Sequence, residues 1–345
     1  MLNRLEVGNQ ALGRRARIFL QVYHHACSFV GTYSKFHMSA LAVSVCCISY
    51  NHESYLAQAI ESVLMQRTEF DVELVIGEDC STDNTRQIAL DYQKRYPDRI
   101  RVLLPEHNLG VMRNLMATMD ACTGTYIAFL EGDDYWTDPH KLQRQVEALR
   151  AHPECTLCAH DAQVLSDDGT TNNYVFSSQF PHVLPSTEGS ITQDKLVAHH
   201  WFIPSASMLF VKAALTLPLP AWFSGVHSGD YTLQLLATRT GLIYYLPCIM
   251  SVYRRHATSL THITHRSLAQ NQKRIFENQQ YRAMMPKHYA RFFEAYLEHL
   301  YFEKSELKGV EGNKLAQLYY YAKAVSVNKE RLAFHISRLT KRLVQ

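Results

Sequence analysis

Tyr126-Ile-Ala-Phe-Leu-Glu-Gly-Asp-Asp134 joins a run of five apolar residues to three carboxylates within four positions. The apolar run has the length of a strand that is buried on both faces, and the change to acidic residues marks its end. Because side chains alternate along a strand, we expect Glu131 and Asp133 to share one face and Asp134 to turn into the following loop. The stretch therefore predicts a buried strand that brings carboxylates to one edge of a sheet.

Three earlier apolar runs of strand length repeat this arrangement, and each is followed by a segment with helical periodicity. The runs are residues 43–48, 72–76 and 100–104. After the first run, apolar residues recur between positions 56 and 64 at the spacing of one helix face. Repeated strand–helix units predict an α/β fold with a doubly wound, mostly parallel sheet and right-handed crossovers.

Polar residues stand at the carboxyl end of all four predicted strands, where ligands bind in doubly wound sheets. The ends are Ser49-Tyr50-Asn51, Glu78-Asp79, His107-Asn108 and the segment from Glu131 to Asp134. We expect them to form one edge of one pocket. Carboxylate oxygens suit Mg²⁺ or Mn²⁺, and such an ion also binds a diphosphate. A plainer interpretation is that these acids, and the segment 81–85, are solvated turns before helices, with Asn51 and Ser81 or Thr82 as N-caps.

The pattern changes beyond residue 153. It predicts strands at 156–165, 205–211 and 242–246, a helix at 230–240, and a long polar loop at 170–200. From residue 266 the chain is rich in Gln, Lys and Glu and has helical periodicity with interspersed aromatic residues. We therefore expect a small C-terminal helical subdomain that packs on the sheet domain.

The charge is unevenly distributed along the 345 residues, although the formal net charge is only +3. Residues 39–265 carry 15 Lys and Arg against 24 Asp and Glu, whereas residues 266–345 carry 15 against 7. An acidic part attracts divalent cations, and a basic tail suits a phosphate-rich surface. A solvated helical face explains the tail equally well.

The eight cysteines are scattered, and Cys46, Cys47 and Cys248 lie in apolar runs. This pattern is typical of buried thiols in a reducing compartment rather than of a disulfide framework. The pair Cys155-Thr-Leu-Cys158 has redox or zinc spacing, but because it falls in a predicted strand without a second pair, we interpret it as structural. No apolar run reaches the 18 residues of a membrane span.

Four motifs occur in a characteristic order. They are Val43-Ser-Val-Cys-Cys-Ile-Ser-Tyr-Asn51, Ile76-Gly-Glu-Asp-Cys-Ser-Thr-Asp83, Asn108-Leu-Gly-Val-Met-Arg-Asn114 and Phe129-Leu-Glu-Gly-Asp-Asp-Tyr-Trp136. Together they resemble the nucleotide-sugar half of glycosyltransferase family 2, the inverting enzymes of GT-A fold, and a weaker likeness continues to about residue 259. The resemblance implies a GT-A catalytic domain at 39–265, with a nucleotide-sugar half (39–150) and an acceptor half (151–265). Residues 1–38 would then be a poorly ordered extension and 266–345 a helical C-terminal region.

The resemblance also implies roles for residues of the first half. Tyr50 and Asn51 would line the nucleobase and ribose. Asp79 would bind the base, next to Glu78, which replaces the first Asp of the family's Asp-Asp-Gly-Ser motif as Cys80 replaces its Gly. In the third motif, Arg113 would lie near the nucleotide. In the fourth, Glu131 would contact ribose or a metal-bound water, and Asp133 would bind the metal directly. Asp134 would support the metal or contact the donor sugar.

In the second half, Asp230 resembles the family's general base, although an acid there can also be a helix cap. The segment Tyr253-Arg-Arg-His256 resembles the part that closes over the diphosphate. Arg254 or Arg255 would neutralise phosphate and His256 would be a further metal ligand, with a structural histidine as the alternative. Trp201 fits either the acceptor site or the core.

With these features, the resemblance implies an inverting, Mg²⁺- or Mn²⁺-dependent transferase that uses a nucleotide-sugar donor, a UDP-sugar by preference. It also implies that the acceptor is a glycan or lipid-linked acceptor in cell-surface polysaccharide synthesis. We expect no nucleic-acid partner, a cytoplasmic location, and peripheral contact with the inner face of the membrane through the basic C-terminal region. A dehydrogenase is disfavoured because no GxGxxG follows residues 43–48, and a nucleotidyltransferase because that position lacks a Gly-rich basic loop. A non-catalytic sugar-nucleotide-binding or scaffolding module remains the alternative if Glu78 and Cys80 disable the donor site.

Overall fold

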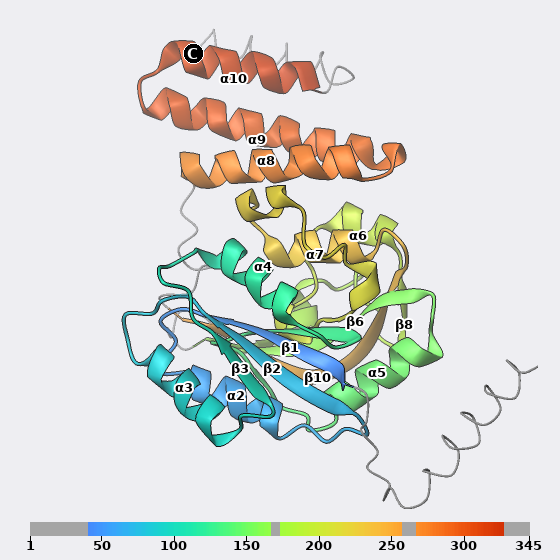
Figure 1. Cartoon of the computed structure of the whole chain (residues 1–345). Coiled ribbons are helices and arrows are strands. Elements are labelled where there is room, and N and C mark those ends of the chain that lie inside the picture. The colour runs from blue at the N-terminus through green and yellow to red at the C-terminus, as the bar shows by residue number, and fades with distance from the viewer. Residues whose placement is uncertain (1–40, 167–172, 257–266, 328–345) are drawn as a thin grey trace, which may run out of the picture. The chain divides into compact units, whose positions relative to one another are not determined.

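The computed structural model describes residues 41–166, 173–256 and 267–327 (Figure 1). The predicted extension at 1–38 lies outside the described residues, as do residues 257–259, where the weaker likeness to the family ends. In the described part, no helix is both long and apolar enough to cross a membrane.

Four parallel strands form the first half of the sheet. They are β1 (Leu41–Ser49), β2 (Asp71–Glu78), β3 (Ile100–Leu103) and β4 (Tyr126–Glu131). β1 lies in the middle, between β2 and β4, and β3 pairs with the outer edge of β2. In this register Ser49 pairs with Glu78 and Ile48 pairs with Glu131, so the polar strand ends lie side by side. The predicted doubly wound parallel sheet is confirmed.

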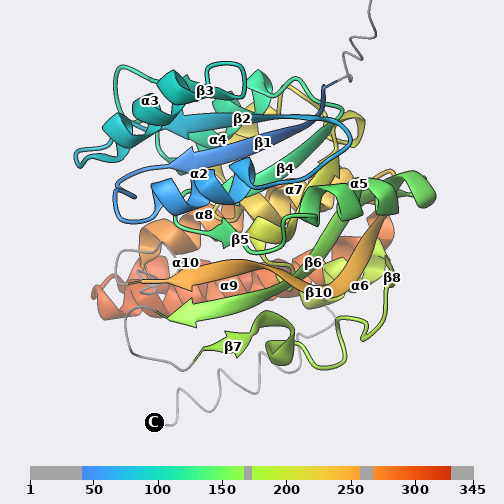
Figure 2. The ribbon, with the colours of Figure 1, turned by 90° about the horizontal axis from the view of Figure 1, so that it is seen from below.

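The second half of the sheet is mixed. Its strands are β5 (Tyr135–Trp136), β6 (Cys155–Ser166), β7 (Tyr174–Val175), β8 (Gly189–Ile191), β9 (Leu209–Val211) and β10 (Leu242–Arg255). The short β9 runs antiparallel to both β4 and β6 and joins the two halves. β10 runs parallel to β6, and β7 and β8 lie along the outside of these two long strands (Figure 2).

β10 is much longer than the predicted strand at 242–246. Its register with β6 shifts between Leu246 and Ile249 and again before Ser251, and Pro247 lies in the first of these irregularities. Proline has no N–H to donate to a ladder and is usually found where a strand is irregular or at its end. The strand nevertheless continues past this irregularity to Arg255, so Tyr253 and Arg254 reach the site at its end.

Helices cover both faces of the sheet, as alternate residues of β1 show. Val45 and Cys47 pack in the core under α2 (Leu56–Leu64), α3 (Thr85–Arg95) and α5 (Lys141–Ala151). Cys46 and Ile48 face the other core, with α4 (Val111–Ala121), α6 (Gln193–His199) and α7 (Gly229–Ala237). Short 3₁₀ turns are at Phe176–Gln179, Ser205–Ser207, Lys212–Ala214, Ala221–Gly225 and Lys287–Tyr289.

The predicted C-terminal helical subdomain consists of α8 (Leu268–Met284), α9 (Ala290–Val310) and α10 (Lys314–Val327). These helices lie on the same side of the sheet as α4 and α7 (Figure 1). Tyr281 of α8 and Phe293 of α9 are buried in the core that contains α7. The helical region is therefore packed into the domain rather than appended to it.

Several local predictions are wrong. The loop predicted at 170–200 contains β7, β8 and α6, and the strand predicted at 205–211 is a 3₁₀ turn followed by the three-residue β9. Cys248 is half-buried rather than buried. The other predictions for cysteine hold, since all the described cysteines are free and Cys155 and Cys158 lie buried in β6. The predicted N-caps Asn51, Ser81 and Thr82 do not precede a helix directly, because α2 begins after Tyr55 and α3 after Asn84.

The expected capping residues instead connect two loops. The backbone N–H of Asn51 donates to Oγ of Ser81 at 3.0 Å, and that of Thr82 donates to Oδ1 of Asn51 at 2.8 Å. Asn51 adopts a left-handed conformation with φ of 55°, which Asn tolerates better than most residues. These bonds fix the loop after β1 against the loop after β2.

Candidate active site

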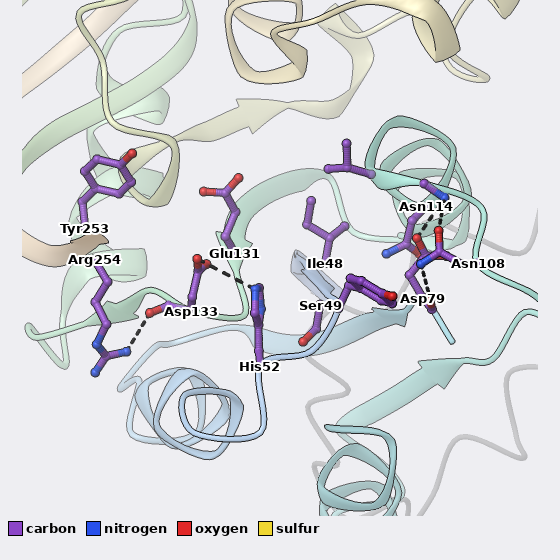
Figure 3. Close-up of a pocket in the computed structure, with 13 residues that line it drawn as sticks. Ile48, Ser49, His52, Asp79, Asn108, Asn114, Glu131, Asp133, Tyr253 and Arg254 are labelled. Carbon is purple, nitrogen blue, oxygen red and sulfur yellow. Dashed lines mark hydrogen bonds and ion pairs between the residues drawn. The ribbon is translucent and has the colours of Figure 1, made fainter. Parts of the chain in front are cut away.

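A cavity of about 320 Å³ lies at the carboxyl ends of β1, β2 and β4, beside the end of β10. All four predicted strand ends contribute to it. The lining residues are Ile48, Ser49, Tyr50, His52, Asp79, Asn108, Gly110, Val111, Asn114, Glu131, Asp133, Tyr253 and Arg254 (Figure 3). The sheet therefore brings together residues from Ile48 to Arg254, which lie more than 200 positions apart in the sequence.

Glu131 and Asp133 both line the cavity, as the alternation along the strand predicts. Burial, together with the nearby charges of Asp133 and Asp230, raises the pKa of Glu131 to about 8, and Oγ of Ser205 donates to Oε2 of Glu131 at 3.0 Å. Burial alone would also raise the pKa of Asp133. The hydrogen bond from His256 and the charges of His52 and His256 outweigh it, so the pKa of Asp133 lies below its usual value.

Two imidazoles converge on one oxygen of Asp133. Nε2 of His256 lies 3.0 Å from Oδ2, and Nε2 of His52 lies 3.9 Å from the same atom. Figure 3 shows Asp133 between His52 and Arg254, with Glu131 nearby. The sequence identified His256 but missed His52, although it directly follows the polar end of the first strand. Burial lowers the pKa of His52, which favours its neutral form, the form that binds metals.

Asp134 points away from the cavity. Its side chain is fully buried, and Oδ1 accepts a hydrogen bond from the backbone N–H of Arg254 at 2.8 Å. Burial and the neighbouring carboxylates raise the pKa of Asp134 well above its usual value. The structure thus places Asp134 as a link between the loop after β4 and the end of β10, and does not bring it to the cavity.

Arg254 closes one side of the cavity. Nη1 donates to the backbone carbonyl of Asp133 at 2.6 Å, and the guanidinium also bonds to Oε1 of Gln58. It lies over the rings of Tyr55 and Tyr135, at 5.0 and 4.6 Å from their centroids. These contacts hold the end of β10 against the loop that carries Asp133. Arg255, the other candidate for a phosphate contact, is half-buried and is not among the lining residues.

Asp79 lines the other end of the cavity, where it also anchors the loop before α4. Its Oδ1 accepts from the backbone N–H of Leu109 at 2.7 Å, and its Oδ2 from that of Gly110 at 3.0 Å. Nδ2 of Asn108 donates to the carbonyl of Asp79 at 2.9 Å. A carboxylate with two accepted bonds keeps further lone pairs for a ligand. Arg113 is exposed on α4 and does not reach the cavity.

Glu78 is not brought to the cavity. It is fully buried, and its two oxygens accept from the backbone N–H of Ser81 at 2.7 Å and from Nε of Arg86 at 2.6 Å. Cys80 adopts the left-handed conformation, with φ of 59°, at the position where the family motif has glycine. The altered motif therefore keeps a glycine-like backbone, and Asp79 still faces the cavity. Tyr50 lines the cavity and is 43% exposed, whereas Asn51 is engaged with Thr82.

Asp230 lies in the first turn of α7. Its Oδ2 accepts a hydrogen bond from the indole N–H of Trp201, which the sequence placed in either the acceptor site or the core. Burial raises the pKa of Asp230, and the charge of Asp230 in turn contributes to the raised pKa of Glu131. Asp230 is not one of the lining residues of the cavity, and its charge is the link to Glu131, which is.

The side chains of Asp133 and His256 suit a cation whose remaining ligands come from a bound diphosphate. Among the described residues, no three or more His, Cys, Asp and Glu side chains form a group that could hold a metal ion by themselves. Oδ2 of Asp133 and Nε2 of His256 nevertheless lie 3.0 Å apart, so a carboxylate and an imidazole stand side by side. Oxygen and imidazole ligands fit Mn²⁺, and Mg²⁺ commonly binds through one or two carboxylates plus substrate phosphates. The residues present therefore fit a cation shared with a diphosphate.

Comparisons with known proteins give the class of the domain. The model of the family described as glycosyl transferase family 2 matches residues 44–215, so the chain belongs to glycosyltransferase family 2 through this domain. An uncharacterised protein of Mycobacterium tuberculosis is 39% identical over 220 residues, which cover 64% of this chain and 60% of that protein. The chain thus spans three-fifths of the length of this relative.

Two further proteins are similar. The Escherichia coli enzyme WfgD, named as a UDP-Glc:α-D-GlcNAc-diphosphoundecaprenol β-1,3-glucosyltransferase, is 27% identical over 65% of this chain and 81% of its own. The crystal structure of S. aureus TarS 1–349 in complex with UDP-GlcNAc superimposes with a TM-score of 0.59 at 14% identity. That match covers 83% of this chain and 81% of the other, and it confirms the GT-A fold.

Proposed function

We propose that the chain is an inverting glycosyltransferase that moves a sugar from a nucleotide-diphosphate donor to a glycan or lipid-linked acceptor in cell-surface polysaccharide synthesis. The observation that carries the proposal is the convergence of four strand ends and the end of β10 on one cavity, with Asp133 beside His256 and Asp230 coupled to Glu131. A nucleoside fits the end with Asp79, Asn108 and Tyr50, and a diphosphate fits the end with Arg254 and His256.

Inverting transfer is a single in-line displacement at the anomeric carbon, and it needs a base for the acceptor hydroxyl. Asp230 takes that proton, and Trp201 holds one carboxylate oxygen so that the other is directed at the acceptor. Because burial raises its pKa, Asp230 is a stronger base than an exposed aspartate. Mg²⁺ or Mn²⁺ at Asp133 and His256 would stabilise charge on the departing diphosphate. Arg254 adds a fixed positive charge on the same side.

A UDP-sugar and a lipid-linked acceptor are the preferred substrates. The E. coli relative is named for UDP-Glc and a diphosphoundecaprenol-linked acceptor, and the TarS structure holds UDP-GlcNAc. In this chain, Asp79 is a buried acceptor at the nucleoside end of the cavity, and such a group can receive the N3–H of uracil.

The proposal is tested by titrating UDP, with GDP as the matched control, in the presence and absence of Mn²⁺. We expect UDP to bind about tenfold or more tightly with Mn²⁺ than without it, because the cation completes its coordination with the phosphates. A panel of UDP-sugars should then show slow hydrolysis of the true donor. Metal-dependent UDP binding without turnover of any sugar nucleotide would favour the non-catalytic module, and absence of nucleotide binding would contradict both functions.

We also propose that the C-terminal helical region contacts the inner face of the membrane. The region from residue 266 onward carries a net positive charge. Within it, α10 presents Leu315, Leu318 and Tyr319 at helical spacing, and these side chains are 83%, 63% and 59% exposed. An apolar stripe beside lysines is typical of helices that lie at a lipid surface.

Replacing Leu315, Leu318 and Tyr319 together by serine should reduce co-sedimentation with phosphatidylglycerol-containing vesicles by about tenfold or more, because the variant lacks the three exposed apolar side chains that the lipid would cover. Ile249→Ser, an exposed apolar site on β10, is the control and should sediment like the wild type. Equal sedimentation of the triple variant would contradict the membrane contact.

A further inference from the structure

The start of α7 is held by α8 rather than by a cap of its own. The side chain of Ser228, the residue before the helix, makes no capping hydrogen bond. Instead, Oε2 of Glu277 accepts from the backbone N–H of His227 at 2.8 Å and from that of Ser228 at 3.0 Å. Half-buried amides at a helix start need such an acceptor, and here a distant helix supplies it.

A second contact lies one turn further along both helices. The hydroxyl of Tyr281 is 2.7 Å from Oγ1 of Thr232, and Oγ1 in turn donates to the carbonyl of Ser228 at 2.6 Å. Glu277 and Tyr281 are four residues apart, so they share the face of α8 that meets α7. Two contacts one turn apart fix both the position and the rotation of the first turn of α7.

The first turn of α7 also packs against α4. A Cβ atom on Gly229 would lie 2.8 Å from Sδ of Met112 and 3.2 Å from Cδ2 of Leu115, so the first turn has no room to move toward α4. Asp230 follows Gly229, and its carboxylate is bonded to Trp201. The direction of the Asp230 side chain is therefore set jointly by α8, α4 and Trp201.

Glu277 is an unfavourable residue for a purely structural contact. It is 5% exposed, and burial, with a contribution from the charge of Asp230, raises the pKa of Glu277 to about 7. A buried carboxylate near a second one costs folding free energy. Departures of this kind from a stable core are expected at functional sites.

We propose that Glu277 is a positioning residue for Asp230, through which the C-terminal helical region takes part in sugar transfer. Glu277 holds the backbone at His227 and Ser228 so that Asp230 meets the acceptor hydroxyl. The inference rests on the proposed role of Asp230 as the base. It extends that role from α7 to α8, and both helices lie beyond the matched family domain of residues 44–215.

The test compares Glu277→Ala and Glu277→Gln with the control Glu303→Ala. Glu303 is 7% exposed on α9 and accepts from Nδ2 of Asn271 at 2.9 Å and Nη1 of Arg274 at 3.2 Å, both on α8. We expect Glu277→Ala to lower kcat about 10- to 100-fold, the effect of a misplaced catalytic group, with KM for the donor nearly unchanged. Glu277→Gln should recover most of kcat because its amide oxygen accepts the same bonds. Glu303→Ala should lower Tm but not kcat.

A second measurement tests the effect of Glu277 on the surroundings of Asp230 and needs no enzyme assay. The chain has three tryptophans, so 5-fluorotryptophan labelling gives three ¹⁹F resonances, and Trp201→Phe assigns the one beside Asp230. This resonance should shift in Glu277→Ala and stay in place in Glu303→Ala. If Glu277→Ala does not fold, Tyr281→Phe, which removes the second contact, should shift the same resonance and lower kcat.

Wild-type kcat and an unshifted Trp201 resonance in both Glu277 variants would overturn the proposal, as would an equal loss of kcat in Glu303→Ala. A wild-type chain that turns over no sugar nucleotide would contradict the proposed function instead. The ¹⁹F measurement would still decide whether Glu277 positions Asp230.

Discussion

Asp230→Asn is expected to slow sugar transfer by about 10²–10⁴-fold, the usual contribution of a general base, while UDP-sugar affinity stays within about a factor of two. The amide has the size of the carboxylate and can still accept the indole N–H of Trp201, so the geometry at the start of α7 is kept. What is lost is the ability to take a proton. The loss should therefore fall on kcat rather than on KM for the donor.

Transfer is measured with saturating donor and acceptor, and affinity by titration of the UDP-sugar. Asp194→Asn is the matched control, because Asp194 is also an acid in the first turn of a helix, α6, and it is exposed. The control should transfer at the wild-type rate. Turnover by Asp230→Asn that equals the control would show that another group takes the proton, and the role of α7 would have to be reassigned.

The first half of the fold could be predicted because its signals are local. Each parallel strand there is a short apolar run that ends at a polar residue, and parallel pairing with short loops brings the ends to one edge. The pocket at this edge follows from the pattern alone. The predicted alternation of side chains is also confirmed at the end of β4, where Glu131 and Asp133 face the cavity and Asp134 does not.

Individual roles within the motifs could not be predicted from their positions. Glu78 and Asp79 are adjacent acids, and alternation sends one to the cavity and the other to Arg86. No pattern in the sequence around Glu78 predicts its ion pair with Arg86. Arg113 lies in a matching motif, yet helical periodicity turns it outward while Asn114 lines the cavity.

The closing side of the site depends on contacts between distant segments. Arg254 and His256 reach Asp133 only because β10 continues beyond the irregularity at Pro247 along the whole length of β6. A proline within a short apolar run favours an early strand end, which is why the sequence predicted five residues instead of fourteen. Pairing with the distant strand β6 sets the length of β10, and no local sequence pattern predicts this pairing.

Asp133→Asn is expected to reduce kcat/KM for the donor roughly 10³-fold and to remove the dependence of UDP binding on Mn²⁺. The three carboxylates after β4 differ in charge. The pKa of Glu131 is raised to about 8 and that of Asp134 well above its usual value, whereas that of Asp133 is lowered by His256 and His52. Near neutral pH, Asp133 is therefore the one of the three that offers a full negative charge, and the amide removes it without changing the size of the side chain.

The measurement is the rise in Tm that UDP and Mn²⁺ produce together, since a ligand that binds the folded state stabilises it by mass action. Wild type and Asp134→Asn should show the same rise, because Asn resembles the protonated form that Asp134 already favours and can still accept the N–H of Arg254. Asp133→Asn should show none beyond that of UDP alone. The reverse result, a rise lost in Asp134→Asn and kept in Asp133→Asn, would transfer the metal to Asp134. It would also mean that donor binding turns the buried Asp134 side chain into the cavity, because in this structure it faces the backbone of β10 instead.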